Sequence, residues 1–271
     1  MGNNENIGGV ELKHVITFQT QLMMGAQFGR IIEAKKKAKE EGAKDEIRDE
    51  LLVACLRMGW NDAFRHTSEN VANLEEEIKK HNKDSKAEYD DYFCTILKND
   101  DLLTIFHNYA CDESKADYLV SKCNELDEII GKVKLTNGNH ALCFGHYQKM
   151  FNIALKLYLC LYLCRDFLEL GLELFYGDII KALNYADCPV DSIILNRIDE
   201  KAGIGLEEYK SYNNNKYRNK KFSSVVWSKI GKAENSTIES YKNIQAAVKM
   251  LNNDDNKSNL YFDFAEWKNN E

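Results

Sequence analysis

Residues 157–164 read Leu157-Tyr158-Leu159-Cys160-Leu161-Tyr162-Leu163-Cys164. This run has no polar face at either a helical or a strand period, and an element that is apolar on every side is buried on every side. Good helix formers continue without a break before and after the run, which favours a central helix over a strand. The apolar stretch is also well short of the roughly 20 residues that a membrane-spanning helix needs. The run therefore predicts the middle of a protein core.

The rest of the chain predicts an all-α fold around this helix. A single proline, Pro189, and 15 glycines leave few of the turn formers that an all-β chain needs. Helical periodicity predicts helices over residues 10–41, 45–66, 68–80, 87–98, 101–109, 113–133, 190–202 and 236–251. Residues 260–267 form an aromatic-rich docking segment. We expect one main helical domain over 1–271, a compact multi-helix assembly with at most one short strand or extended arm near 223–230.

Composition and cysteine usage indicate the compartment. The hydrophobic fraction of 44% and the charged fraction of 29% exclude wholesale disorder. Residues 1–9 are polar and lack the apolar region of a signal peptide. Without an export signal, the eight cysteines are predicted to be reduced and mostly buried rather than joined in disulfides. The sequence thus predicts a soluble, cytoplasmic protein with no membrane segment.

A polar stripe leads into the apolar run from its N-terminal side. Spacings of three and four place Lys149, Asn152 and Lys156 on one helix face. Because a lysine is costly to desolvate, such a stripe either pairs with internal acids, for example Asp187 or Asp191, or binds an anionic ligand such as a phosphate or carboxylate group. Both interpretations stay open. The ligand-site interpretation comprises His146, Gln148, Lys149, Asn152, Lys156 and Asp191.

Two motifs around this stripe carry a family resemblance. The first reads Phe144-Gly145-His146-Tyr147-Gln148-Lys149-Met150-Phe151-Asn152, and the second reads Cys188-Pro189-Val190-Asp191-Ser192-Ile193-Ile194-Leu195. Together they resemble a pattern of uncharacterised bacterial and phage-type proteins, over roughly residues 140–200. The resemblance implies no activity, no fold and no site residue. The second motif also predicts a helix start, because proline is favoured at the first helical position and an acid soon after it suits the helix dipole.

Histidines and cysteines raise the question of a metal. His140, Cys143 and His146 recur every three residues, and Cys160 and Cys164 stand four apart. Zinc uses these residue types, but successive steps of three fan ligands round a helix by about 60° each. The chain also contains no Cys-x-x-Cys pair. The sequence therefore predicts no metal and no cofactor.

Catalytic motifs are scarce. The chain has no phosphate-binding Gly-x-x-x-x-Gly-Lys-Ser/Thr loop, no Gly-x-Ser-x-Gly elbow, no His-Glu-x-x-His and no Gly-x-Gly-x-x-Gly. Asp62 and His66 share a helix face at i and i+4, which would orient an imidazole, although helix-end electrostatics explains the pair equally well. The enzyme alternative is a helical nuclease or nucleotide-processing enzyme with a site around His146, Lys149 and Lys156.

Residues 209–233, the basic-aromatic segment, contain seven basic residues and no acid, with aromatic residues interleaved. Cationic side chains neutralise phosphates while aromatic rings stack on bases, so this mixture suits a nucleotide or single-stranded nucleic acid. The alternative is a solvated loop, because the chain has a net charge of −7 and nucleic-acid binders are usually basic. We expect an exposed loop over 209–223. The expected nucleic-acid contacts are Lys216, Tyr217, Arg218, Lys220 and Lys221.

These observations favour a binding or interaction protein over an enzyme. The sequence predicts an anionic ligand, either a nucleotide or single-stranded nucleic acid, or another macromolecule. A protein partner or a homo-oligomer is compatible with the same patterns.

Overall fold

Helices enclose a hydrophobic core in the computed structural model, which describes residues 6–7, 10–11, 44–65, 96–130, 142–166, 170–202, 222–232 and 236–267. The α-helices in these ranges are α3 (Lys44–Arg65), α6 (Asp100–Cys111), α7 (Lys115–Ile130), α8 (Phe144–Leu163), α9 (Gly177–Ala182), α10 (Ser192–Ala202), α12 (Ile238–Asn252) and α13 (Asn259–Trp267). Short 3-10 helices are η1 (Leu172–Leu174), η2 (Leu183–Tyr185), η3 (Phe222–Ser224) and η4 (Trp227–Lys229). The predicted all-α fold is confirmed.

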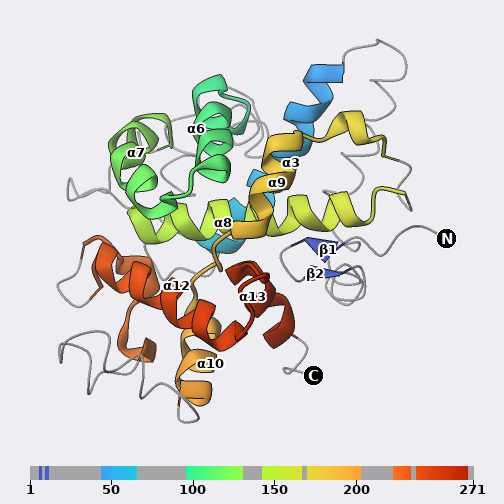
Figure 1. Cartoon of the computed structure of the whole chain (residues 1–271). Coiled ribbons are helices and arrows are strands. Elements are labelled where there is room, and N and C mark those ends of the chain that lie inside the picture. Colours follow the sequence, from blue (N-terminus) through green and yellow to red (C-terminus); the bar gives the residue numbers. More distant parts are fainter. Residues whose placement is uncertain are drawn as a thin grey trace.

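Helix α8 runs through the middle of the molecule, with α6 and α7 on one side and α10, α12 and α13 on the other (Figure 1). Almost every residue from Phe144 to Leu161 is buried, including the first part of the Leu157–Cys164 run. A helix covered from all sides needs no polar face. The predicted central buried helix is therefore confirmed, and it organises the packing of its neighbours.

The most extensive helix–helix contact in the described part of the chain joins α3 to α8. Gly59 makes it possible, because a Cβ atom at this position would overlap the carbonyl oxygen of Met150 on α8. A glycine here lets the two backbones touch. Gly25 and Gly29, which are four residues apart and could allow a similar approach, lie outside the described residues.

Two helices begin later than the sequence predicts. Helix α10 begins at Ser192, with the side chain of Asp191 accepting a hydrogen bond from the Ile194 amide at 2.9 Å. Asp191 is thus the N-cap, and Pro189 lies before the helix rather than at its first position. Helix α12 begins at Ile238, two residues after the predicted start, and Thr237 and Ser240 form its capping box, in which the Thr237 hydroxyl accepts from the Ser240 amide at 3.2 Å.

The described chain begins with a short hairpin where the sequence predicts the start of a helix. Val10–Glu11 is a strand, paired antiparallel with Asn6–Ile7, so the predicted helix does not begin at residue 10. The Gly8-Gly9 pair between the strands is a hairpin signal that outweighs the helical periodicity. Residues 12–43 and 66–95 lie outside the description, and with them the predicted helix over 68–80 and most of that over 87–98.

Residues 222–232 form two 3-10 turns, η3 and η4, rather than a strand. Side chains bind the backbone amides that a strand would need. The carboxylate of Asp199 accepts from the Phe222 and Ser223 amides at 2.7 and 2.8 Å, and Ser236 Oγ accepts from the Val226 amide at 3.0 Å. The predicted exposed loop over 209–223 lies outside the described residues as far as residue 221. No described helix has the length and apolarity to cross a membrane.

Candidate functional site

Four polar residues of α8, the α8 polar stripe (Gln148, Lys149, Asn152 and Lys156), are all buried. Gln148 binds both backbone polar groups of one residue: its Nε2 donates to the Val190 carbonyl at 3.0 Å, and its Oε1 accepts from the Val190 amide at 3.2 Å. Gln245 of α12 binds Cys188 in the same way, at 2.7 and 2.9 Å. These two glutamines satisfy an extended backbone that pairs with no strand of the described chain. They fix the second sequence motif against α8.

Asn152 continues the network towards α6 and α12. Its Oδ1 accepts from the Tyr109 hydroxyl at 2.8 Å, and its Nδ2 donates to the Tyr241 hydroxyl at 3.0 Å. Tyr241 in turn donates to the carboxylate of Asp187 at 2.7 Å. Burial raises the pKa of Asp187, against the effects of this hydrogen bond and of Lys115. Asp187 therefore pairs with a tyrosine hydroxyl and not with the α8 polar stripe.

Lys156 forms the deepest ion pair of the described residues. Its Nζ lies 2.7 Å from Asp263 Oδ2 of α13 and 4.8 Å from the centre of the Phe264 ring. The exposed fractions of the two side chains are only 1% and 9%. A buried charge that has a buried counter-charge needs no bound ion. The geometry thus makes Lys156 a link between α8 and α13.

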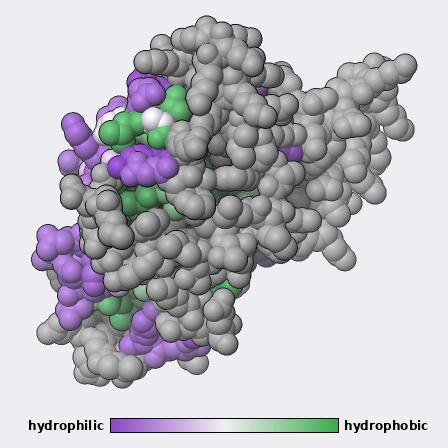
Figure 2. All heavy atoms as spheres, turned by 90° about the vertical axis from the view of Figure 1, so that its right-hand side faces the viewer, coloured by the Kyte–Doolittle hydropathy of each residue, from purple (hydrophilic) through white to green (hydrophobic). Residues whose placement is uncertain are grey.

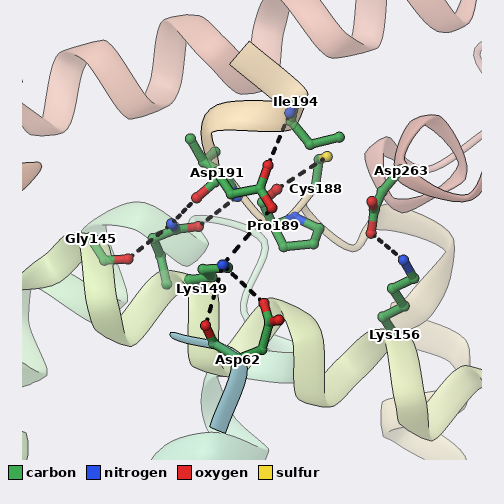
Figure 3. A network of polar contacts seen from close by, with 11 residues as sticks. Asp62, Gly145, Lys149, Lys156, Cys188, Pro189, Asp191, Ile194 and Asp263 are labelled. Carbon is green, nitrogen blue, oxygen red and sulfur yellow. Dashed lines mark hydrogen bonds and ion pairs between the residues drawn. The ribbon is translucent and has the colours of Figure 1, made fainter. Parts of the chain in front are cut away.

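Lys149 lies at the more exposed end of the stripe, between two carboxylates (Figure 3). Its Nζ is 2.9 Å from Asp62 Oδ2 of α3, 3.9 Å from Asp191 Oδ2 and 4.7 Å from the centre of the Trp227 ring. The lysine is 5% exposed, but Asp62 is 42% and Asp191 24% exposed. Burial raises the pKa of Asp191, while Lys149 lowers it. An approaching anion would meet two carboxylates before the ammonium group.

His146 faces Cys143 and Trp227 at the start of α8. Its Nδ1 lies 3.4 Å from Cys143 Sγ, and burial, helped by Lys232 and Lys149, lowers the pKa of His146 to about 4. The Cys143 thiol donates to the Ser228 carbonyl at 3.0 Å, and burial raises its pKa. A protonated thiol bound to backbone is not an activated nucleophile. This Cys–His contact therefore gives the enzyme alternative no support.

The turn that carries Trp227 is fixed to the first turn of α8. The Gly145 amide donates to the Ile230 carbonyl at 3.2 Å, and a Cβ atom on Gly145 would overlap the Trp227 carbonyl oxygen. Lys229 and Lys232 are exposed on this turn. The described end of the basic-aromatic segment, residues 222–232, is thus held in a fixed position on α8, and we call it the platform. Its predicted contacts Lys216, Tyr217, Arg218, Lys220 and Lys221 lie outside the described residues.

Large apolar side chains that are exposed come from six separate segments of the described chain. They are Val120, Leu172, Tyr185, Ile193, Val226 and Met250. Figure 2 shows hydrophilic side chains along one edge of the molecule with apolar ones between them. Scattered apolar residues of this kind need no partner to cover them.

The structure brings together Lys149 and Asp191, and it joins Gln148 to Asn152 at 3.4 Å. It separates Lys156, which has its own partner on another helix. Sequence reasoning missed Asp263, Tyr109 and Tyr241 as partners of the stripe. The sequence did contain one sign of a buried acid, because Asp263 lies within the aromatic-rich segment 260–267. His66 and His140 lie outside the described residues.

Comparison with family models, curated proteins and solved structures finds no significant match. The resemblance to bacterial and phage-type proteins therefore stays a prediction.

Proposed function

We propose that this protein is a binding protein that engages an anionic ligand, single-stranded nucleic acid in the first place, through its basic-aromatic segment. One observation carries the proposal: Lys229 and Lys232 are exposed beside Trp227 on a turn that is held against α8. Cations that flank an aromatic ring on a fixed turn are suited to phosphates and stacked bases. The remaining five basic residues of the segment precede this platform in the chain.

The α8 polar stripe supports the platform and does not compete with it as an anion site. Lys149 and Lys156 both have carboxylate partners within the protein, so neither offers an uncompensated charge to a phosphate. Among the residues that the structure describes, no activated nucleophile lies beside His146, Lys149 and Lys156, the centre of the enzyme alternative. We therefore assign the ligand contacts to the basic-aromatic segment. The α8 polar stripe has the structural role of holding the turn with Trp227 in place.

The test replaces Lys216, Arg218, Lys220 and Lys221 with glutamine. We expect weaker binding to a fluorescent single-stranded oligonucleotide by anisotropy, with a salt dependence that falls by about 0.7 in slope for each lost phosphate contact. Replacing Tyr212 and Tyr217 with alanine should weaken binding by about 1 to 3 kcal/mol per stacked base and leave the slope unchanged.

A charge-matched control replaces four basic residues outside the segment with glutamine. They are Lys98, Lys122, Lys181 and Lys242. This control should leave both affinity and slope near those of the original protein. Equal losses in the two variants, or no oligonucleotide binding at low salt, would contradict the proposal. If a mononucleotide displaces the fluorescent oligonucleotide at a concentration similar to that of unlabelled oligonucleotide, the ligand is a nucleotide rather than a nucleic-acid strand.

We further propose a cytoplasmic, reducing setting. None of the seven cysteines in the described ranges forms a disulfide, and most of them are buried. Reduced thiols are the rule where glutathione and thioredoxin act. Titration of the denatured protein without reductant should find all eight cysteines reactive, and native mass spectrometry of the same sample would report a protein partner or a homo-oligomer.

A further inference from the structure

Three side chains of metal-binding type meet on the side of α6 that faces α9. His107 and Cys111 stand four apart on α6, and Asp178 lies in the first turn of α9, 71 residues after His107. One ligand atom of each residue lies within 4.8 Å of the other two. Among the described residues, this is the group of histidine, cysteine and acid side chains close enough to share an ion. No sequence motif joins them, because helix packing brings Asp178 to the pair.

The carboxylate and the imidazole are already oriented towards each other. Asp178 Oδ1 accepts from the Ile179 amide at 2.9 Å, which leaves Oδ2 to face His107 Nε2 at 2.7 Å. The His107 ring packs edge-on against Tyr176, with 4.9 Å between the ring centres. Ligands that are held by such neighbours lose little freedom when a metal binds.

Three backbone carbonyl oxygens near the group are already bound, so the three side chains are the atoms that can bind a metal ion. Lys115 Nζ binds three carbonyl oxygens near the end of α6, those of Tyr109, Ala110 and Asp112, at 2.8 to 3.2 Å. Those carbonyls therefore already have a cation. Cys111 is half-buried and free, and His107 is 27% exposed, so an ion can reach the group from solvent.

We propose that His107, Cys111 and Asp178 bind a zinc ion. On binding, the thiol releases its proton to solvent. The hydrogen bond between His107 and Asp178 gives way to a bond from each residue to the ion, and the neutral imidazole keeps its one proton on the ring nitrogen that does not bind. The thiolate and the carboxylate then balance the two charges of Zn²⁺. Imidazole and thiolate ligands favour zinc over magnesium or calcium, which prefer oxygen. Zinc bonds of about 2.0 to 2.3 Å require shifts of about 1 Å in the side chains, within rotamer freedom. Three protein ligands leave a fourth position for water or a small ligand.

The test titrates Co²⁺, a spectroscopic substitute for zinc, into the full chain after reduction and removal of metals by a chelator. We expect a thiolate-to-cobalt absorption band that saturates at one equivalent and is abolished by Zn²⁺. Cys111→Ser should remove the band. His107→Ala and Asp178→Asn should keep the thiol but weaken binding more than about 100-fold, beyond the loss typical of a supporting residue.

Cys123→Ser is the matched control, because Cys123 is another half-buried free cysteine, on α7. This variant should keep the band and the affinity. Far-ultraviolet circular dichroism of each metal-free variant shows whether it has folded, and Asp178→Asn, which keeps a hydrogen-bonding side chain, decides the matter should Cys111→Ser unfold. The absence of a band in the original protein, or a band that survives Cys111→Ser, overturns the proposal.

Discussion

The two ends of the α8 polar stripe hold the same chemical pair in different surroundings. Lys149 contacts carboxylates that are 42% and 24% exposed, whereas the partner of Lys156 is 9% exposed. The two lysines are seven positions apart on one face of one helix. What separates them is therefore the covering elements: α13 closes the Lys156 end, while the Lys149 end lies against the turn with Trp227. Depth, rather than residue type, decides which end can respond to solvent.

The largest effect should come from the closed end. Lys156→Met leaves Asp263 as a buried charge without its ammonium partner, and such a loss costs about 3 to 5 kcal/mol in the free energy of unfolding. Urea denaturation measures it. The double variant Lys156→Met with Asp263→Leu removes both charges and should recover most of the stability. If Lys156→Met alone lowers the free energy of unfolding by less than about 1 kcal/mol, the Lys156 end is no more buried in energetic terms than the Lys149 end, and the comparison fails.

The second effect is a pH response of the Lys149 end. The folded protein holds His146 neutral, with a pKa of about 4, whereas the unfolded chain binds a proton near pH 6.5. Stability is therefore lost as the pH falls from about 6.5 to about 4, by about 3 kcal/mol over the whole window. Measuring the free energy of unfolding of the original protein and of His146→Gln at several pH values isolates the contribution of His146. Parallel curves for the two proteins would rule out a role for His146.

A smaller effect is expected for Lys149→Met. Asp62 and Asp191 keep contact with water when the ammonium is lost, so we expect about 1 to 2 kcal/mol, between the values for exposed and buried pairs. Added salt should shrink this loss, because exposed charges are screened, and should change the Lys156→Met loss little. Denaturation of both variants at low and high salt makes the comparison. A larger loss at Lys149 than at Lys156 would reverse our ranking.

The smallest effect on stability belongs to the platform. Lys229→Gln with Lys232→Gln changes exposed side chains and should alter the free energy of unfolding by less than about 0.5 kcal/mol. The same variant should flatten the salt dependence of oligonucleotide binding by about 0.7 for each lost phosphate contact. Unchanged binding would move the ligand contacts away from the described end of the segment.

The fold could be predicted largely from the sequence because its signals are local. The Leu157–Cys164 run indicates burial by itself, and helical periodicity gave α3, α6 and α7 to within a few residues. Helix starts were harder, since the Val190 amide is bound by Gln148, 42 positions away, and the helix begins only after it.

The candidate site was predictable only in part. The stripe itself follows from spacings of three and four, and Asp191 was correctly expected near a lysine. Asp187, the other acid considered, does not pair with a lysine of the stripe, because the Tyr241 hydroxyl binds its carboxylate. The partners Asp62 and Asp263 come from helices at opposite ends of the described chain, and no local pattern states which helix will pack where. The His107, Cys111 and Asp178 group could not be predicted for the same reason, because it forms only when α9 packs against α6.

The anchoring of η3 on α10 has a consequence for engineering. Helix α10 is described as far as Ala202, and the amides of Phe222 and Ser223, about 20 residues later in the chain, bind Asp199 of the same helix. The gap between Ala202 and Phe222 is thus closed by contacts that do not depend on how many residues lie between them. Doubling the length of such an excursion adds only about 0.6 kcal/mol of closure entropy. A peptide tag or fluorescent module inserted between residues 203 and 221 should therefore leave the helical core intact.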